Sequence, residues 1–139
     1  MKKALILTGK NVQDHEFIYP YYRLQEEGFE VTVATEEGIE TVGNLGTKIP
    51  VNTKIIDINP NDYDLLILPG GAKAMEYLRQ NKLIINIIKE WNSKNKVISS
   101  ICHATQLLIS AEIVKGKKIS GYYSIKDDIN NAGAVYVDA

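Results

Sequence analysis

Apolar residues along the chain alternate between short strand-like runs and longer helix-like segments. Residues 3–8 (KALILT) form a short apolar run that ends at a glycine, and residues 29–35 (FEVTVAT) alternate apolar and polar positions with β-branched side chains. Both patterns are typical of strands. Between them, residues 16–27 place apolar side chains at helical spacing and stop at Gly28, which favours a helix end. This part of the chain therefore predicts a β-α-β unit.

The same alternation continues through the rest of the chain. Residues 64–68 (DLLIL) are apolar on both faces, as in a buried parallel strand, and the turn Pro69-Gly70-Gly71 ends this run abruptly. A helix should follow this turn. The later patterns predict a helix at 83–91, a strand at 97–101, a helix at 105–113 and a last strand at 134–137. The segment 43–58 combines strand-like residues with many breakers and predicts a small β-hairpin insertion.

Repeated β-α-β units predict an α/β fold of the flavodoxin-like, doubly wound kind. The sheet should be mostly parallel with helices on both faces, because parallel strands are joined by right-handed crossovers. A chain of 139 residues is the size of one domain, so residues 1–139 are expected to form a single unit. In such sheets, ligands bind beyond the carboxyl ends of the strands. Three features lie there, and we expect them to meet in one pocket: residues 9–16, the Pro-Gly-Gly turn, and Cys102-His103.

Composition narrows the possible partners. The 16 basic and 17 acidic residues are nearly balanced and form no long like-charge block, which argues against a nucleic-acid partner. The single cysteine cannot form an internal disulfide, and the N-terminal apolar run is too short for a signal peptide, so we expect a cytoplasmic protein. No apolar run is long enough to cross a membrane. Without Cys-x-x-Cys, His-Glu-x-x-His or Walker patterns, we predict no metal and no cofactor.

The stretch SICHA contains the only cysteine of the chain, Cys102, at a strand-to-helix junction. A nucleophile elbow has this layout, because its strained turn requires small residues two positions before and after the nucleophile, and Ser100 and Ala104 meet that requirement. At the first turn of a helix, the dipole and nearby N–H groups should lower the thiol pKa. The alternative is an inert, buried cysteine that behaves as a small hydrophobe.

Four further residues are candidates for the same site. His103 could accept the thiol proton or stabilise a thiolate as imidazolium. Gly70 and Gly71 would let backbone N–H groups approach a substrate, as an oxyanion hole requires, although a Gly-Gly pair after a strand is commonly only a turn. Glu16 could simply complement the helix dipole. If it faces the sulfur instead, it should be protonated and donate a hydrogen bond to it.

Four segments of the sequence carry a family resemblance: FIYPYYRLQEEGFEV, YDLLILPGG, VISSICHATQLLISA and IKDDINNAGAVYVDA. Together they resemble the ThiJ/PfpI family of the class I glutamine amidotransferase-like superfamily, and within it the PfpI-type intracellular proteases. The resemblance implies a flavodoxin-like sandwich, with Cys102 as nucleophile, His103 beside it, and Glu16 as a carboxylic acid that touches the sulfur. Gly71 and the His103 amide would be the oxyanion donors.

The resemblance also implies a homo-oligomer, a dimer or a hexamer, in which an acidic residue of a neighbouring subunit completes the site. Glu76 is the nearest match to that residue if one residue is inserted after the Pro-Gly-Gly turn. Two positions depart from the family pattern. Gln13 stands where protease-branch relatives often carry an acid, and the chain ends at Ala139, where relatives usually continue with a strand and a helix.

These residues favour a cysteine hydrolase that attacks the carbonyl of a small peptide through the Cys102 thiolate. A related hypothesis is a glyoxalase or protein deglycase that acts on 2-oxoaldehydes or their adducts. A third is a redox sensor or chaperone in which oxidised Cys102 is held by Glu16, and a fourth is an interaction domain with an inert cysteine.

Overall fold

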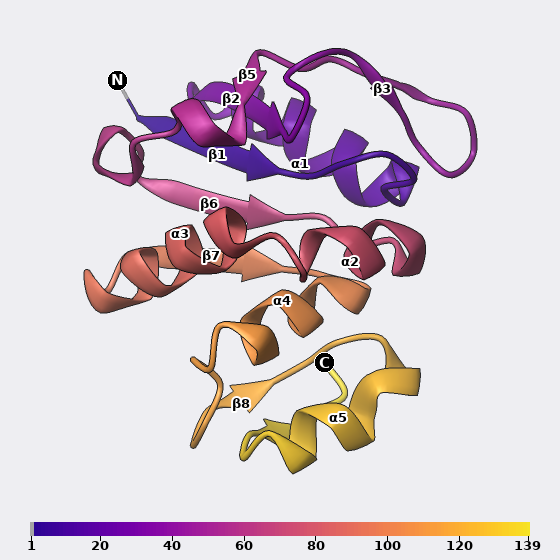
Figure 1. Cartoon of the computed structure of the whole chain (residues 1–139), viewed down its shortest axis with the longest axis vertical. Coiled ribbons are helices and arrows are strands. Elements are labelled where there is room, and N and C mark those ends of the chain that lie inside the picture. Colours follow the sequence, from indigo (N-terminus) through magenta and orange to yellow (C-terminus); the bar gives the residue numbers. More distant parts are fainter. Residues whose placement is uncertain (1) are drawn as a thin grey trace.

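Five parallel strands form the central sheet of the protein. In the computed structural model, which describes residues 2–139, the strand order is β5-β2-β1-β6-β7 (Figure 1). All four strand pairings are parallel. The carboxyl ends of the strands therefore all point the same way. The predicted site residues come directly after these strand ends. The strands are β1 (Lys3–Leu7), β2 (Glu30–Thr35), β5 (Thr53–Lys54), β6 (Leu65–Leu68) and β7 (Val97–Ser100).

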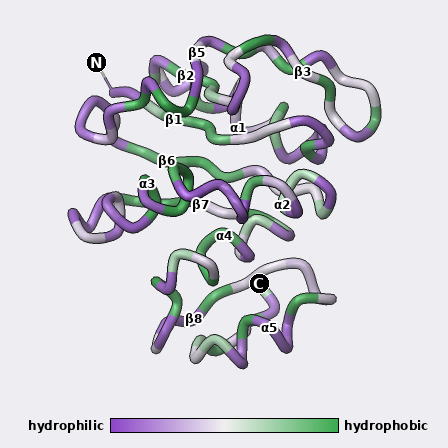
Figure 2. The backbone as a smooth tube through the Cα atoms, in the orientation of Figure 1, coloured by the Kyte–Doolittle hydropathy of each residue, from purple (hydrophilic) through white to green (hydrophobic). Residues whose placement is uncertain are grey.

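Helices cover both faces of this sheet, as predicted. Successive strand side chains point to opposite faces, so Leu5 and Leu66 pack with the later helices, whereas Ile6 and Ile67 pack with Phe17 of α1. Figure 2 shows how strongly apolar residues concentrate on β1 and β6. The doubly wound α/β fold is thus confirmed. The helices are α1 (Asp14–Glu26), α2 (Ala72–Leu78), α3 (Lys82–Ser93), α4 (Thr105–Ser110) and α5 (Lys126–Asn131).

The predicted hairpin is present, with different bounds. Strands β3 (Thr41–Val42) and β4 (Lys48–Ile49) pair antiparallel, whereas the later part of the predicted segment joins the central sheet as β5. The cause is Asn52, which binds Val33 of β2 twice. Its backbone N–H donates to the Val33 carbonyl at 2.9 Å, and its side-chain oxygen accepts from the Val33 N–H at 2.7 Å. These two bonds direct the following residues along β2.

The C-terminal segment forms a small sheet of its own. Strand β8 (Lys118–Ile119) pairs in parallel with β9 (Val135–Tyr136), and α5 connects them. The strand predicted at 134–137 is therefore confirmed, although it does not join the central sheet. The helix predicted at 105–113 ends at Ser110, and Glu112 adopts a left-handed backbone with φ 58°.

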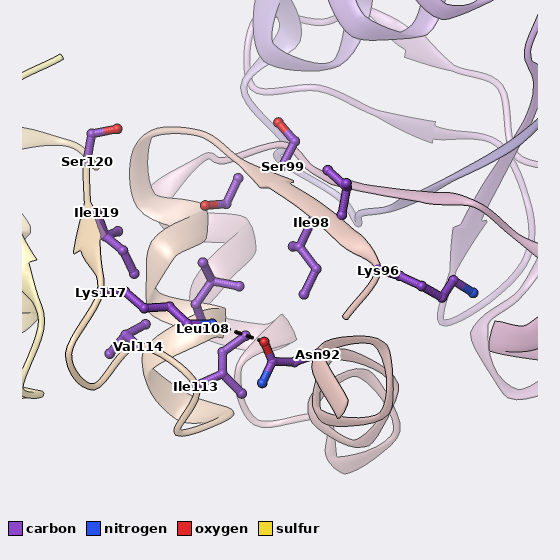
Figure 3. A pocket seen from close by; sticks show the side chains of 12 residues that line it. Asn92, Lys96, Ile98, Ser99, Leu108, Ile113, Val114, Lys117, Ile119 and Ser120 are labelled. Carbon is purple, nitrogen blue, oxygen red and sulfur yellow. Dashed lines mark hydrogen bonds between the residues drawn. The ribbon is translucent and has the colours of Figure 1, made fainter. Parts of the chain in front are cut away.

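Within the described residues, β7 is an edge strand with its outer side unpaired. Its first residue, Val97, is 64% exposed. A hollow lies between β7 and the segment that carries β8, and its lining includes the apolar side chains of Ile98, Leu108, Val114 and Ile119 (Figure 3). No helix within residues 2–139 has both the length and the apolar character required to span a membrane.

Candidate active site

Cys102 occupies a strained turn directly beyond the end of β7. Its φ is 61°, in the left-handed region that side-chain-bearing residues rarely adopt. A 3-10 turn, Cys102–Ala104, follows and leads into α4, so the chain reverses sharply at the cysteine. Two hydrogen bonds hold this turn: the N–H of Ala104 donates to the Ile101 carbonyl at 3.0 Å, and the N–H of Tyr122 donates to the Cys102 carbonyl at 3.1 Å. This geometry agrees with the nucleophile elbow expected from the sequence.

Glu16 reaches the sulfur from the first turn of α1. Its carboxyl group forms a hydrogen bond with the Cys102 thiol, and its Oε1 accepts the N–H of Gly70 at 2.9 Å. No larger residue fits at position 70. An added Cβ would lie 2.5 Å from Glu16 Oε1 and 2.8 Å from the carbonyl oxygen of Ile101. Glu16, Gly70 and Cys102 therefore form one connected cluster, as the sequence predicted.

The pKa values of this cluster differ in part from the prediction. Burial raises the pKa of Glu16, while hydrogen bonds from Cys102 and Gly70 offset part of that rise. Burial also raises the pKa of Cys102, and together with the Glu16 carboxylate it brings the value to about 11. The lowered thiol pKa expected from the helix terminus is therefore wrong for this arrangement. The reason is that a neighbouring carboxylate and loss of water outweigh the N–H of His103, which acts in the opposite direction.

Glu16 and Cys102 are best described as one acid pair. Burial raises the pKa of both members, and the Glu16 carboxylate further disfavours the Cys102 thiolate, whereas the hydrogen bond from Cys102 opposes the rise in the pKa of Glu16. The Cys102 thiol therefore loses its proton to solvent only near pH 11. The pair can instead keep one proton between its members, either on sulfur or on the carboxyl group with the sulfur as thiolate.

His103 lies within reach of the same sulfur. Its Nδ1 is 3.5 Å from Sγ, and its ring stacks on Tyr122 with centroids 4.8 Å apart. Adjacent residues need not face each other, and here the stack turns the imidazole toward the thiol. Sequence reasoning missed Tyr122, because no local pattern in the sequence indicates that its loop approaches the cysteine.

The two glycines of the Pro-Gly-Gly turn have different environments. The N–H of Gly70 is bound to Glu16, which leaves the N–H of Gly71 for a substrate. Gly71 has φ 107°, and an added Cβ would lie 2.7 Å from the carbonyl oxygen of Asn11 and 2.8 Å from the Gln13 nitrogen. The oxyanion role of these glycines remains a prediction, and the geometry favours Gly71.

Glu76 does not reach Cys102 within one chain. It lies on α2, where it accepts a hydrogen bond from Lys73 Nζ at 3.0 Å, and its side chain is 61% exposed. Its predicted role concerns a neighbouring subunit and stays a prediction. No cluster of three or more His, Cys, Asp and Glu side chains suited to a metal ion occurs within residues 2–139.

Two surface hollows meet at the thiol. The first continues toward the C-terminal segment, where Tyr122, Tyr136 and Asp138 line it. The second extends toward the hairpin and is lined by Asn11 and Gln13, both from the segment 9–16 that was expected at the site. Asn44 and Lys73 also line it, and sequence reasoning did not connect these two residues with the site.

Known proteins resemble this chain along nearly its whole length. Residues 2–139 match the sequence profile of the DJ-1/PfpI family. The chain belongs to the DJ-1/PfpI family. A deglycase of Pyrococcus horikoshii is 43% identical over 137 residues, which is 99% of this chain and 82% of that protein. YraA of Bacillus subtilis, provisionally named as a cysteine protease, is 35% identical over 139 residues, again 82% of its length.

A solved structure gives the same result for the fold. A two-domain protein of Anabaena variabilis, with DJ-1/ThiJ/PfpI-like and ferritin-like domains, superimposes with a TM-score of 0.96 at 30% identity. The match covers 100% of this chain and 40% of the Anabaena protein. The family resemblance recognised in the sequence is therefore confirmed.

Proposed function

We propose that the protein is a cysteine hydrolase in which Cys102 attacks the carbonyl carbon of its substrate. One observation carries the proposal. The sulfur of a cysteine on a left-handed turn lies 3.5 Å from a histidine nitrogen and shares a hydrogen bond with Glu16. Strained backbone and paired acids of this kind cluster at reactive sites.

The reaction uses the shared proton of the acid pair. Glu16 takes the proton while Sγ forms a bond to the carbonyl carbon and the carbonyl electrons move to oxygen. The N–H of Gly71 stabilises that oxyanion. As the bond to the leaving group breaks, His103 transfers a proton to it and takes the proton held by Glu16, which leaves a thioester on Cys102. Water then adds to the thioester, the acid is released, and one proton of that water returns through His103 to the Glu16–Cys102 pair.

A deglycase is the second candidate, and the name of the Pyrococcus relative favours it. The same thiolate would add to an aldehyde or ketone carbon and form a hemithioacetal. The hydrolase reaction instead continues to a thioester. Both reactions use the nucleophile and the oxyanion donor in the same way, so the substrate distinguishes them. Peptides and reactive carbonyl adducts are the two substrate classes to compare.

A turnover panel tests the proposal. Purified protein is assayed with a fluorogenic peptide and with methylglyoxal, beside Cys102→Ala and a control, Glu27→Gln, which alters an exposed side chain at the C-cap of α1. The proposal predicts turnover of the peptide, lost in Cys102→Ala and retained in the control, whereas turnover of methylglyoxal alone would favour the deglycase. Absence of turnover, with peroxide adding oxygen to Cys102 alone, would overturn it in favour of a redox sensor.

A further inference from the structure

Three amide side chains border the hollow that leads from Cys102 toward the hairpin. Asn11 follows β1, Gln13 is the N-cap of α1, and Asn44 lies in the loop between β3 and β4. They come from separate elements and converge on one hollow of about 430 Å³. An amide both donates and accepts hydrogen bonds, so such a lining suits a neutral polar ligand better than an ion.

Backbone hydrogen bonds fix Asn11 and Asn44 in place. The N–H of Asn11 donates to the Val42 carbonyl at 3.0 Å, and the N–H of Asn44 donates to the Val12 carbonyl at 2.8 Å. Asn11 also holds a left-handed backbone, with φ 69°. Gln13 uses its side-chain oxygen to accept the His15 N–H at 3.3 Å, which leaves its NH₂ group as a donor.

The hairpin loop is anchored by a buried carboxylate. Asp14 is 2% exposed and accepts the N–H groups of Leu45 at 2.7 Å and Thr47 at 2.9 Å. This clamp sets the position of Asn44 relative to α1. The nearby cation of Lys73 is already engaged, since its Nζ bonds to Glu76 and lies 5.6 Å from the Tyr77 ring centroid. The ligand-binding groups left at this end of the hollow are therefore neutral amides.

We propose that Asn11, Gln13 and Asn44 form a subsite that binds a peptide backbone next to the reacting carbonyl. A peptide group offers one N–H and one C=O, which an amide side chain matches with one acceptor and one donor. This inference rests on the proposed function for the location of the reacting carbonyl. It adds the substrate class, which is a carbonyl compound flanked by peptide amides. A small free aldehyde would leave the subsite empty.

Direct binding tests the subsite without turnover. The protein carrying Cys102→Ala is titrated with N-acetyl-alanyl-alaninamide, and the side-chain amide signals of the protein are followed by NMR. The signals of Asn11, Gln13 and Asn44 should shift together. Adding Asn44→Ala should weaken binding about two- to ten-fold, the usual effect of one lost hydrogen bond. Asn86→Ala, on the exposed side of α3, is the matched control and should leave binding unchanged.

Kinetics supply a second readout if the protein proves active. Asn44→Ala should raise KM for a peptide substrate about two- to ten-fold while kcat stays constant, and it should leave methylglyoxal kinetics unaltered. Unchanged peptide binding in Asn44→Ala, or shifts confined to signals outside the hollow, would overturn the subsite. Failure of the hydrolase proposal would be recognised separately, because turnover would then be absent while the binding result stands.

Discussion

The chemistry proposed for this protein depends on three side chains that meet at the end of β7. Glu16, Cys102 and His103 come from two elements, and each was a candidate from the sequence alone. Their charge states were not predictable in the same way. The sequence pattern indicates a helix terminus after Cys102, but only the folded chain reveals that a half-buried carboxyl group lies against the sulfur. The distinction matters because it changes the nucleophile from a simple thiolate to a proton-sharing pair.

Gly70→Ala tests the packing around that pair. The new Cβ would lie 2.5 Å from Glu16 Oε1 and 2.8 Å from the Ile101 carbonyl oxygen, so it must push Glu16 away from the sulfur. Overpacking of this kind lowers the free energy of unfolding by about 1–3 kcal/mol. Reactivity of Cys102 toward iodoacetamide should also change. Gly28→Ala is the control, because position 28 has φ 83° but no atom within 4 Å of the new Cβ, and it should leave Cys102 reactivity unaltered.

Tyr122 should orient His103 through ring stacking. Tyr122→Ala removes the stack, and kcat/KM on the substrate that the wild type turns over should fall by up to about ten-fold. Tyr122→Phe keeps the ring and should restore most of the activity. Equal loss in both variants would show that the hydroxyl group matters and not the stack.

At the level of elements, the periodic patterns located every strand of the central sheet except β5. The missed strand has two residues, Thr53–Lys54, and its pairing depends on the bonds between Asn52 and Val33, which no local pattern encodes. The site residues show the same difference between local sequence patterns and tertiary contacts. Cys102 was recognisable from its small flanking residues, whereas Tyr122 and Asn44 reach the site through loops whose paths are set by tertiary contacts.

The hairpin should depend on Asp14. Burial opposes its charge, but hydrogen bonds from Thr47 and from the backbone of Leu45 prevail and lower its pKa. A carboxyl group with a lowered folded pKa stabilises the protein above its unfolded value of 3.8, and that contribution disappears as the pH falls through the folded pKa. Asp14→Asn retains one acceptor oxygen and should lower the free energy of unfolding by about 1–3 kcal/mol at pH 7.

Urea unfolding of both forms, at neutral pH and in acid, measures the Asp14 contribution. The difference between wild type and Asp14→Asn should shrink in acid, because the wild-type carboxylate is then protonated as well. A difference that stays constant with pH would contradict the assigned charge state.

At the level of the whole molecule, β7 leaves one edge of the central sheet unpaired within residues 2–139. Val97 is exposed on this edge strand and lines the hollow shown in Figure 3. Unpaired apolar edges associate with other chains. The homo-oligomer expected from the family resemblance and the role of Glu76 in it remain predictions, and this edge adds a second route to self-association.

Val97→Lys should reduce that self-association, since a lysine on an edge strand opposes pairing with another strand. Sedimentation velocity over a concentration series measures the effect. Val135→Lys changes another exposed valine, on β9, and serves as the control. Equal behaviour of the two variants would exclude the β7 edge as the associating surface.

The shared proton of Glu16 and Cys102 is the feature on which the proposed chemistry depends, and alkylation of Cys102 against pH tests it most directly. In the wild type, the iodoacetamide rate should keep rising with pH and level off only near pH 11, because the pKa of Cys102 is raised to about 11. Glu16→Gln removes the carboxylate that helps to raise this pKa, so its rate should level off at a lower pH. Profiles that level off at the same pH in the two proteins would contradict the account.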